Sequence, residues 1–198
     1  YLASPIYVYD QLKKHNDTLA GNIAEEYVLP EQLNDIVGGI AMQAVLEFET
    51  NPDYYTISKQ RIGPLPCKWM EEETDFYVHS WVNIQRKHEF NPQHNHSGKY
   101  SFVLWVKVPY KFEDEMNLEN CKNSNAPSNS KFEFIFLDPF GDIVQQHYPV
   151  DESWEGEMLV FPANLKHAVY PFFTSDDTRI SIAGNVYVTP KDYDPEPI

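Results

Sequence analysis

The chain has 198 residues, 42% of them hydrophobic and 15% aromatic, so it is long enough to form one domain with a sizeable core. Its formal net charge of −15 leaves no basic surface for nucleic acid or for an anionic membrane. Two cysteines, Cys67 and Cys121, are too few for a disulfide framework, and no apolar run is long enough to span a membrane, so we expect a soluble cytoplasmic protein.

The first fifty residues predict a short strand followed by two helices. Residues 5–9 look like a strand, and residues 10–26 carry helix formers with apolar residues roughly at helical spacing. A second helix is expected from Pro30 to Val45, although Gly38 and Gly39 weaken the pattern in its middle. These elements would form a helical buttress on the outside of a sheet.

Beyond Pro52 the pattern changes to β-structure. Six segments are rich in β-branched and aromatic residues and predict strands: Phe76–Gln85, Tyr100–Val108, Lys131–Leu137, Glu157–Phe161, His167–Pro171 and Arg179–Val188. Many short strands after two helices predict a mainly β fold with some α, a β-sandwich or jelly-roll barrel with helices packed on one sheet. We expect one domain over residues 1–198, with a frayed tail at 189–198.

Residues 111–130 differ from their surroundings because they are rich in asparagine and acidic side chains. A polar segment of this length inside a compact domain is usually functional or a solvated insertion. Because it follows the strand after the histidine motif described below, it could form a mobile lid at the mouth of a pocket.

A His-x-His motif, His94-Asn95-His96, is the most informative feature of the sequence. In an extended strand both imidazoles point the same way, and His167, returning on a distant strand, could complete a three-ligand metal site with open positions. The other histidines fit ordinary roles. We expect His15 on an exposed helix and His88 and His147 at the surface, while His79 is expected to be packed or to support a ligand.

Arg179 and Ser181 begin the last predicted strand and share one face of it. The planar guanidinium of arginine can bind a carboxylate in a bidentate manner. Metal ligands followed by such a carboxylate clamp indicate a 2-oxoglutarate-dependent iron oxygenase.

The sequence also resembles the 2-oxoglutarate/Fe(II)-dependent oxygenase family of phages and marine bacteria, in the prolyl-hydroxylase-like branch of the superfamily. The residues that carry the resemblance are Trp81-Val82-Asn83, Asn91-Pro92-Gln93-His94-Asn95-His96, Tyr100–Val108, Asp138-Pro139, Gly156 through Pro162 with His167, and Arg179 through Asn185, after an opening Ser4-Pro5-Ile6-Tyr7-Val8. The resemblance implies a double-stranded β-helix fold, Fe(II) as metal cofactor, 2-oxoglutarate as cosubstrate, and release of succinate and CO2 as an unknown substrate is hydroxylated.

Roles carried over from the family place the metal on His94, His96 and His167, where the wider superfamily normally has a carboxylate at the second position. The cosubstrate would be bound by a second set of residues, Arg179, Ser181, Trp105 and Asn83. Trp105 stands where related enzymes often place a tyrosine, and its indole N–H could only donate. The pocket would also be lined by Ser101, Val103 and Asn185.

Two alternatives remain open at this stage. One is a cupin-type dioxygenase that uses three histidines without 2-oxoglutarate, and the other is a non-catalytic jelly-roll binding protein.

Three imidazoles also suit zinc and copper, so the residue types do not fix the metal. The substrate could be a small molecule or a peptide, and neither nucleic acid nor a membrane is expected as a partner.

Overall fold

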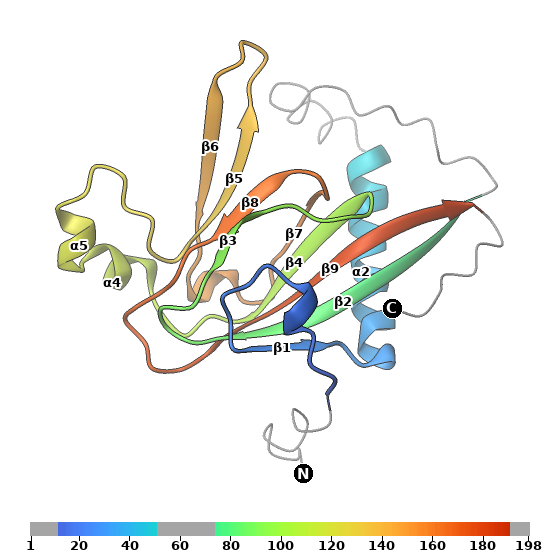
Figure 1. Ribbon diagram of the computed structural model, residues 1–198, viewed down its shortest axis with the longest axis horizontal. Coiled ribbons are helices and arrows are strands. Elements are labelled where there is room, and N and C mark those ends of the chain that lie inside the picture. The colour runs from blue at the N-terminus through green and yellow to red at the C-terminus, as the bar shows by residue number, and fades with distance from the viewer. Residues whose placement is uncertain (1–11, 51–73, 191–198) are drawn as a thin grey trace.

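The computed structural model of the protein describes residues 12–50 and 74–190 (Figure 1). The predicted strand at 5–9, Cys67 and most of the predicted tail lie outside the described residues. No helix among the described residues is both long and apolar enough to cross a membrane.

Two antiparallel sheets form the body of the molecule. The larger sheet has the strand order β1 (Glu25–Val28), β2 (Thr74–Gln85), β9 (Arg179–Pro190), β4 (Tyr100–Lys107) and β7 (Met158–Pro162). The smaller has the order β3 (Asn91–His94), β8 (Lys166–Val169), β5 (Lys131–Leu137) and β6 (Ile143–Pro149). From β2 onward the chain passes back and forth between the sheets, with only β5 and β6 joined as a hairpin within one. This winding is that of a double-stranded β-helix, so the predicted fold class is confirmed.

One long helix, α2 (Glu31–Thr50), covers the outer face of the larger sheet (Figure 1). Buried Val37, Ala41 and Val45 lie about one turn apart and pack in one core cluster with strand residues such as Val82. Gly38 lets the helix approach β2 closely, because a Cβ there would lie 3.1 Å from the Cβ of Val78. The second predicted helix is therefore confirmed. The glycine at position 38, which weakened the helical pattern, is explained by close packing against β2.

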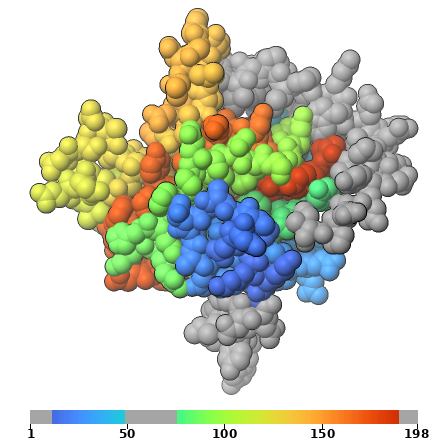
Figure 2. Space-filling view, viewed as in Figure 1, coloured from blue at the N-terminus to red at the C-terminus, as the bar shows by residue number. Residues whose placement is uncertain are grey.

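The first predicted helix, over residues 10–26, is wrong for the residues that the structure describes. Asn16–Thr18 form a short 3-10 helix, η1, and Glu25–Val28 form edge strand β1 on β2. The side chain of Asn16 donates to the backbone oxygen of Ile23 at 2.8 Å, which satisfies that carbonyl outside any helix. The buttress is thus one helix and an edge strand, with residues 12–29 lying across the front of the molecule (Figure 2).

The interior between the two sheets is a second, strongly aromatic core. It holds inward-facing residues of β4, β5 and β7 together with residues of the loops around them, namely Val103, Trp105, Val108, Tyr110, Phe132, Phe134, Val150, Phe161 and Phe172. Phe132 and Phe134 alternate along β5 with Glu133, which lies on the other face of the strand. The two faces of this strand therefore meet different environments.

The polar segment 111–130 is more ordered than predicted. It contains two short helices, α4 (Phe112–Met116) and α5 (Glu119–Lys122), and the side chains of Glu115 and Cys121 are buried. The Glu115 carboxylate accepts the backbone N–H groups of Phe173 and Thr174, at 2.9 and 2.7 Å. The segment is therefore anchored to the fold through Glu115, and a gating role stays a prediction.

Candidate active site

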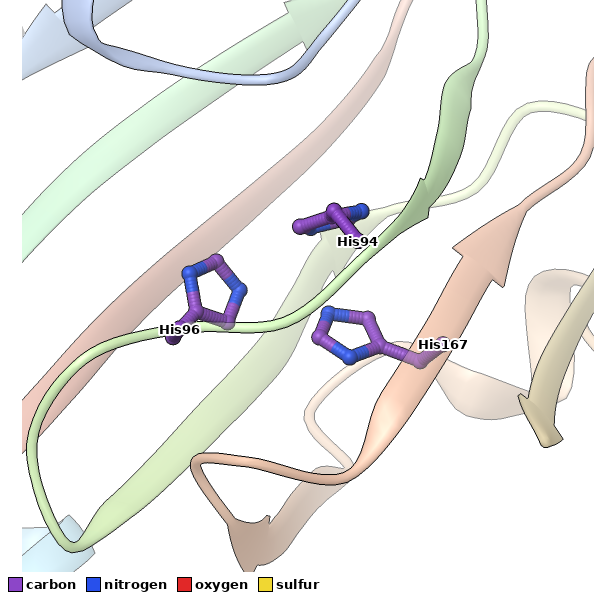
Figure 3. Close-up of side chains that lie close together, drawn as sticks. All are labelled: His94, His96 and His167. Carbon is purple, nitrogen blue, oxygen red and sulfur yellow. The ribbon is translucent and has the colours of Figure 1, made fainter. Parts of the chain in front are cut away.

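Three histidines converge between the sheets (Figure 3). His94, at the end of β3, is the direct cross-strand partner of His167 on β8, so sheet register brings these two imidazoles together. His96 lies just beyond β3, where its N–H donates to the backbone oxygen of Ala163 at 2.8 Å. One ligand nitrogen from each ring lies within 4.8 Å of the others, so the predicted trio is brought together.

The surroundings of the trio prepare it to bind a metal. His94 and His167 each direct Nδ1 toward a backbone oxygen, that of Pro92 at 2.6 Å and that of Leu165 at 2.9 Å. Because those carbonyls can only accept, Nδ1 carries the proton and Nε2 keeps its lone pair for a metal. Burial lowers the pKa of His94, and burial with the neighbouring imidazoles lowers the pKa of His96 to about 3 and that of His167 to about 4. All three rings are therefore neutral near pH 7.

Arg179 lies at the other end of the same pocket and is almost fully buried, with 2% of its surface exposed. Its Nε and Nη2 both donate to Oε1 of Gln85, at 3.1 and 2.6 Å, and Nη2 also donates to the backbone oxygen of Tyr170 at 3.1 Å. Nη1 donates to the hydroxyl of Tyr110 at 2.6 Å. No acidic side chain of the described residues forms an ion pair with Arg179.

This arrangement corrects the predicted clamp in one respect. Gln85 already occupies the Nε and Nη2 edge of the guanidinium, so a ligand has one N–H of Nη1 rather than a free fork. The hydroxyl of Tyr110 accepts from Arg179 and keeps its own hydrogen for donation. Burial raises the pKa of Tyr110, so this hydroxyl stays protonated.

Aromatic packing fixes the position of the arginine. Phe172 stacks on Tyr110 with ring centroids 4.7 Å apart, and the guanidinium carbon lies 5.5 Å from the Phe172 ring. The next two residues of this loop are held by Glu115, as described above. The insertion thus supports the arginine end of the pocket, and no residue that lines the pocket comes from 111–130.

The predicted pocket residues divide into two groups. Asn83, Val103, Trp105 and Ser181 line the pocket together with the three histidines and Arg179. Ser101 and Asn185 do not line it. Both side chains are buried, and Ser101 Oγ donates to Asn185 Oδ1 at 2.8 Å.

Sequence reasoning missed several residues of the site, of which four bear on its chemistry or its shape. Gln85 and Tyr110 hold Arg179, while Asn91 and Ile23 line the pocket. Gln85 shares a strand face with Asn83, so alternation along the predicted strand could have identified it. Ile23 comes from the mispredicted first helix and gave no usable signal.

The remaining described histidines are partly as expected. His88 is exposed, but His147 is half-buried and lies 2.8 Å from a carboxylate oxygen of Glu133. His15 was expected on an exposed helix and is instead buried, because its backbone N–H pairs with the oxygen of Glu26 on β1. His79 is half-buried against Trp81 and His15.

Comparison with known proteins places the chain in a family. Residues 79–185 match the family model described as "Putative 2OG-Fe(II) oxygenase", which is more than half of the chain and includes the three histidines and Arg179. The chain belongs to this family. A search of curated protein sequences gives no match.

Several solved structures are similar at low sequence identity. A prolyl-4-hydroxylase from Pseudomonas putida is 11% identical with a TM-score of 0.44, covering 88% of this chain and 76% of its own. A 2OG-Fe(II) oxygenase family oxidoreductase from Burkholderia pseudomallei is 10% identical with a TM-score of 0.40, covering 73% of this chain and 57% of its own. A cupin domain from Bordetella pertussis is 13% identical with a TM-score of 0.30, covering 60% and 86%.

Proposed function

We propose that the protein is a 2-oxoglutarate- and Fe(II)-dependent dioxygenase that hydroxylates a small-molecule or peptidyl substrate, with 2-oxoglutarate and O2 converted to succinate and CO2. The observation that carries the proposal is a single pocket with three neutral imidazoles at one end and a buried, uncompensated guanidinium at the other. Family membership supports the same metal and cosubstrate.

The donor set fits Fe(II). His94, His96 and His167 would hold it through ring nitrogens, and three protein ligands leave positions for other molecules. When bound, Fe(II) would supply the activation of dioxygen that these side chains cannot perform. The protein holds the imidazoles of His94 and His167 in their ligand tautomers, and the aromatic walls exclude water.

The arginine end fits the distal carboxylate of 2-oxoglutarate. An arginine buried without an acidic partner is costly, and a carboxylate ligand would supply the missing counter-charge. Nη1 of Arg179 and the Tyr110 hydroxyl are the donors available to it.

Asn83 offers a further donor to the same ligand. Its Nδ2 donates to Ser181 Oγ at 3.2 Å, which leaves its buried Oδ1 without a hydrogen-bond partner. With the amide turned over, Ser181 would donate to Oδ1, and the two N–H groups would face the pocket. An acceptor-only ligand such as a dicarboxylate favours that orientation, so Asn83 and Ser181 would bind it together.

Anaerobic calorimetry of 2-oxoglutarate binding to the Fe(II)-loaded protein tests the proposal. We expect one molecule per chain, with binding that requires the metal, and slow formation of succinate when air is admitted. A cupin-type three-histidine dioxygenase or a non-catalytic binding module would bind the metal but not 2-oxoglutarate. Absence of binding to the loaded protein would therefore reject the proposal in favour of these alternatives.

A further inference from the structure

A second pair of imidazoles lies outside the trio. His15, beside η1, and His79, on β2, are 64 residues apart in the chain, yet their Nε2 atoms are 3.2 Å apart. Their ring centroids are separated by 5.1 Å, close to the 4.9 and 5.0 Å that separate His96 from its two partners in the trio. The pair therefore has the spacing of imidazoles that converge on one point.

The hydroxyl of Thr18 contacts the His15 ring. It donates to the backbone oxygen of His15 at 3.0 Å and lies 3.0 Å from Nδ1 and 3.4 Å from Nε2 of the same residue. Thr18 therefore helps to hold the ring in place, with Nε2 of His15 directed to Nε2 of His79. Groups that hold metal-binding imidazoles in position support metal affinity in this way.

Neighbouring groups keep both rings neutral. Burial lowers the pKa of His15 and of His79, and the nearby Lys13 lowers both further, while Asp17 acts in the opposite direction on His15. Neutral imidazoles are the form that binds metals. The ring of Trp81 lies between this pair and the trio, 6.3 Å from His79 and 5.5 Å from His96.

We propose that His15 and His79 form a second binding site for a divalent transition-metal ion such as Zn²⁺, separate from the three-histidine centre. Two nitrogens 3.2 Å apart, each about 2.1 Å from an ion, subtend about 100° at it, close to the tetrahedral angle that zinc prefers. Among the residues described by the structure, only the trio gathers three ligand groups, so this ion would have two protein ligands and open positions.

Such an ion would link the N-terminal segment to the larger sheet. His15 belongs to the segment that also carries Ile23 into the active-site pocket, whereas His79 belongs to the sheet. Metal bound there would hold the segment in place beside the pocket. This inference does not depend on the proposed oxygenase activity.

Zinc stoichiometry tests the site. Apo-protein is titrated with Zn²⁺ against a chromophoric chelator, and we expect two equivalents for the wild type, the second weaker than the first because it has one fewer protein ligand. His79→Ala should leave one equivalent, and so should His94→Ala combined with His167→Ala. The control His147→Ala, whose imidazole lies outside both sites, should keep two.

Two further measurements separate metal binding from loss of folding in a variant, and from a plain hydrogen bond between His15 and His79 that binds no metal. Thr18→Val keeps both imidazoles but removes the hydroxyl that helps to hold the His15 ring in place, so the second equivalent should bind roughly 10-fold or more weakly. In the variant lacking His94 and His167, Zn²⁺ should slow hydrogen exchange at the His15 amide. One equivalent in the wild type, two in His79→Ala, or unchanged exchange at His15 would each overturn the proposal.

Discussion

The two ends of the pocket are built by different means. At the histidine end, the β3–β8 register pairs His94 with His167, and one backbone hydrogen bond places His96. At the other end, Arg179 is held by residues from three separate segments, namely Gln85 on β2, Tyr110 after β4, and the backbone of Tyr170. The histidine end therefore depends on sheet register, and the arginine end on the packing of loops. Substitutions should act in an all-or-none manner at the first and in a graded manner at the second.

The largest effect is expected from His167→Ala. The proposed centre has only three protein ligands, so removing one of them should weaken Fe(II) binding by roughly 100-fold or more. The Fe(II)-dependent consumption of 2-oxoglutarate should then be abolished. Metal content after anaerobic loading and desalting measures the first effect. His147→Ala serves as the matched control and should retain metal. Equal metal content in both variants would show that the trio is not the metal centre.

Arg179→Ala should have the next largest effect, on the cosubstrate alone. Loss of a charge-assisted contact in a sheltered site should weaken 2-oxoglutarate binding by roughly 2–4 kcal/mol. Metal content should barely change, because Arg179 is not a ligand. An unchanged metal content would also show that the variant is folded. Unchanged affinity in anaerobic calorimetry would show that the carboxylate binds elsewhere.

Gln85→Glu refines this test without removing the arginine. The new carboxylate can accept the same two N–H groups, but it also supplies the counter-charge that Arg179 lacks. The attraction for a ligand carboxylate should fall, so 2-oxoglutarate should bind more weakly by about 1–3 kcal/mol. Gln85→Met, which is close in size and uncharged, separates loss of the acceptor from the added charge. Tighter binding in Gln85→Glu would contradict the view that Arg179 needs an anion.

The sequence predicted the histidine end of the pocket more completely than the arginine end, for physical reasons. Two histidines two residues apart, and a third opposite them, are visible in a linear pattern because strand geometry has a fixed period. Arg179 was found in the same way, but its partners Gln85 and Tyr110 were missed because their contacts arise only when strands and loops pack together.

Errors in the fold have a similar origin. Residues 12–26 carry helix formers, but pairing with β2 and the side-chain bonds of Asn16 outweigh that weak propensity. Strand β6, which starts at Ile143, was missed because its polar centre at Gln145 and Gln146 lacks a clear alternation. In both cases tertiary contacts decided the local structure.

The mispredicted N-terminal segment offers a smaller test, at a residue that does not itself line the pocket. Glu26 on β1 is buried, and burial together with the nearby charge of Glu89 raises its pKa to about 7 from an ordinary value of 4.5. The folded protein therefore holds a proton that the unfolded chain releases, so stability falls as the pH rises from about 4.5 and the loss is complete above about 7. The shift corresponds to at most about 3 kcal/mol, and partial solvent screening should reduce it to about 1–2 kcal/mol.

Glu26→Gln removes the titrating group while keeping its shape. At pH 8 the free energy of unfolding in urea should be about 1–2 kcal/mol higher for the variant than for the wild type. This difference should shrink toward pH 5. Glu47→Gln, at an exposed position on α2, should leave the pH dependence unchanged. The same pH dependence in the wild type and in Glu26→Gln would show that Glu26 ionises normally in the folded protein, and that the N-terminal segment covers it less closely than its buried position indicates.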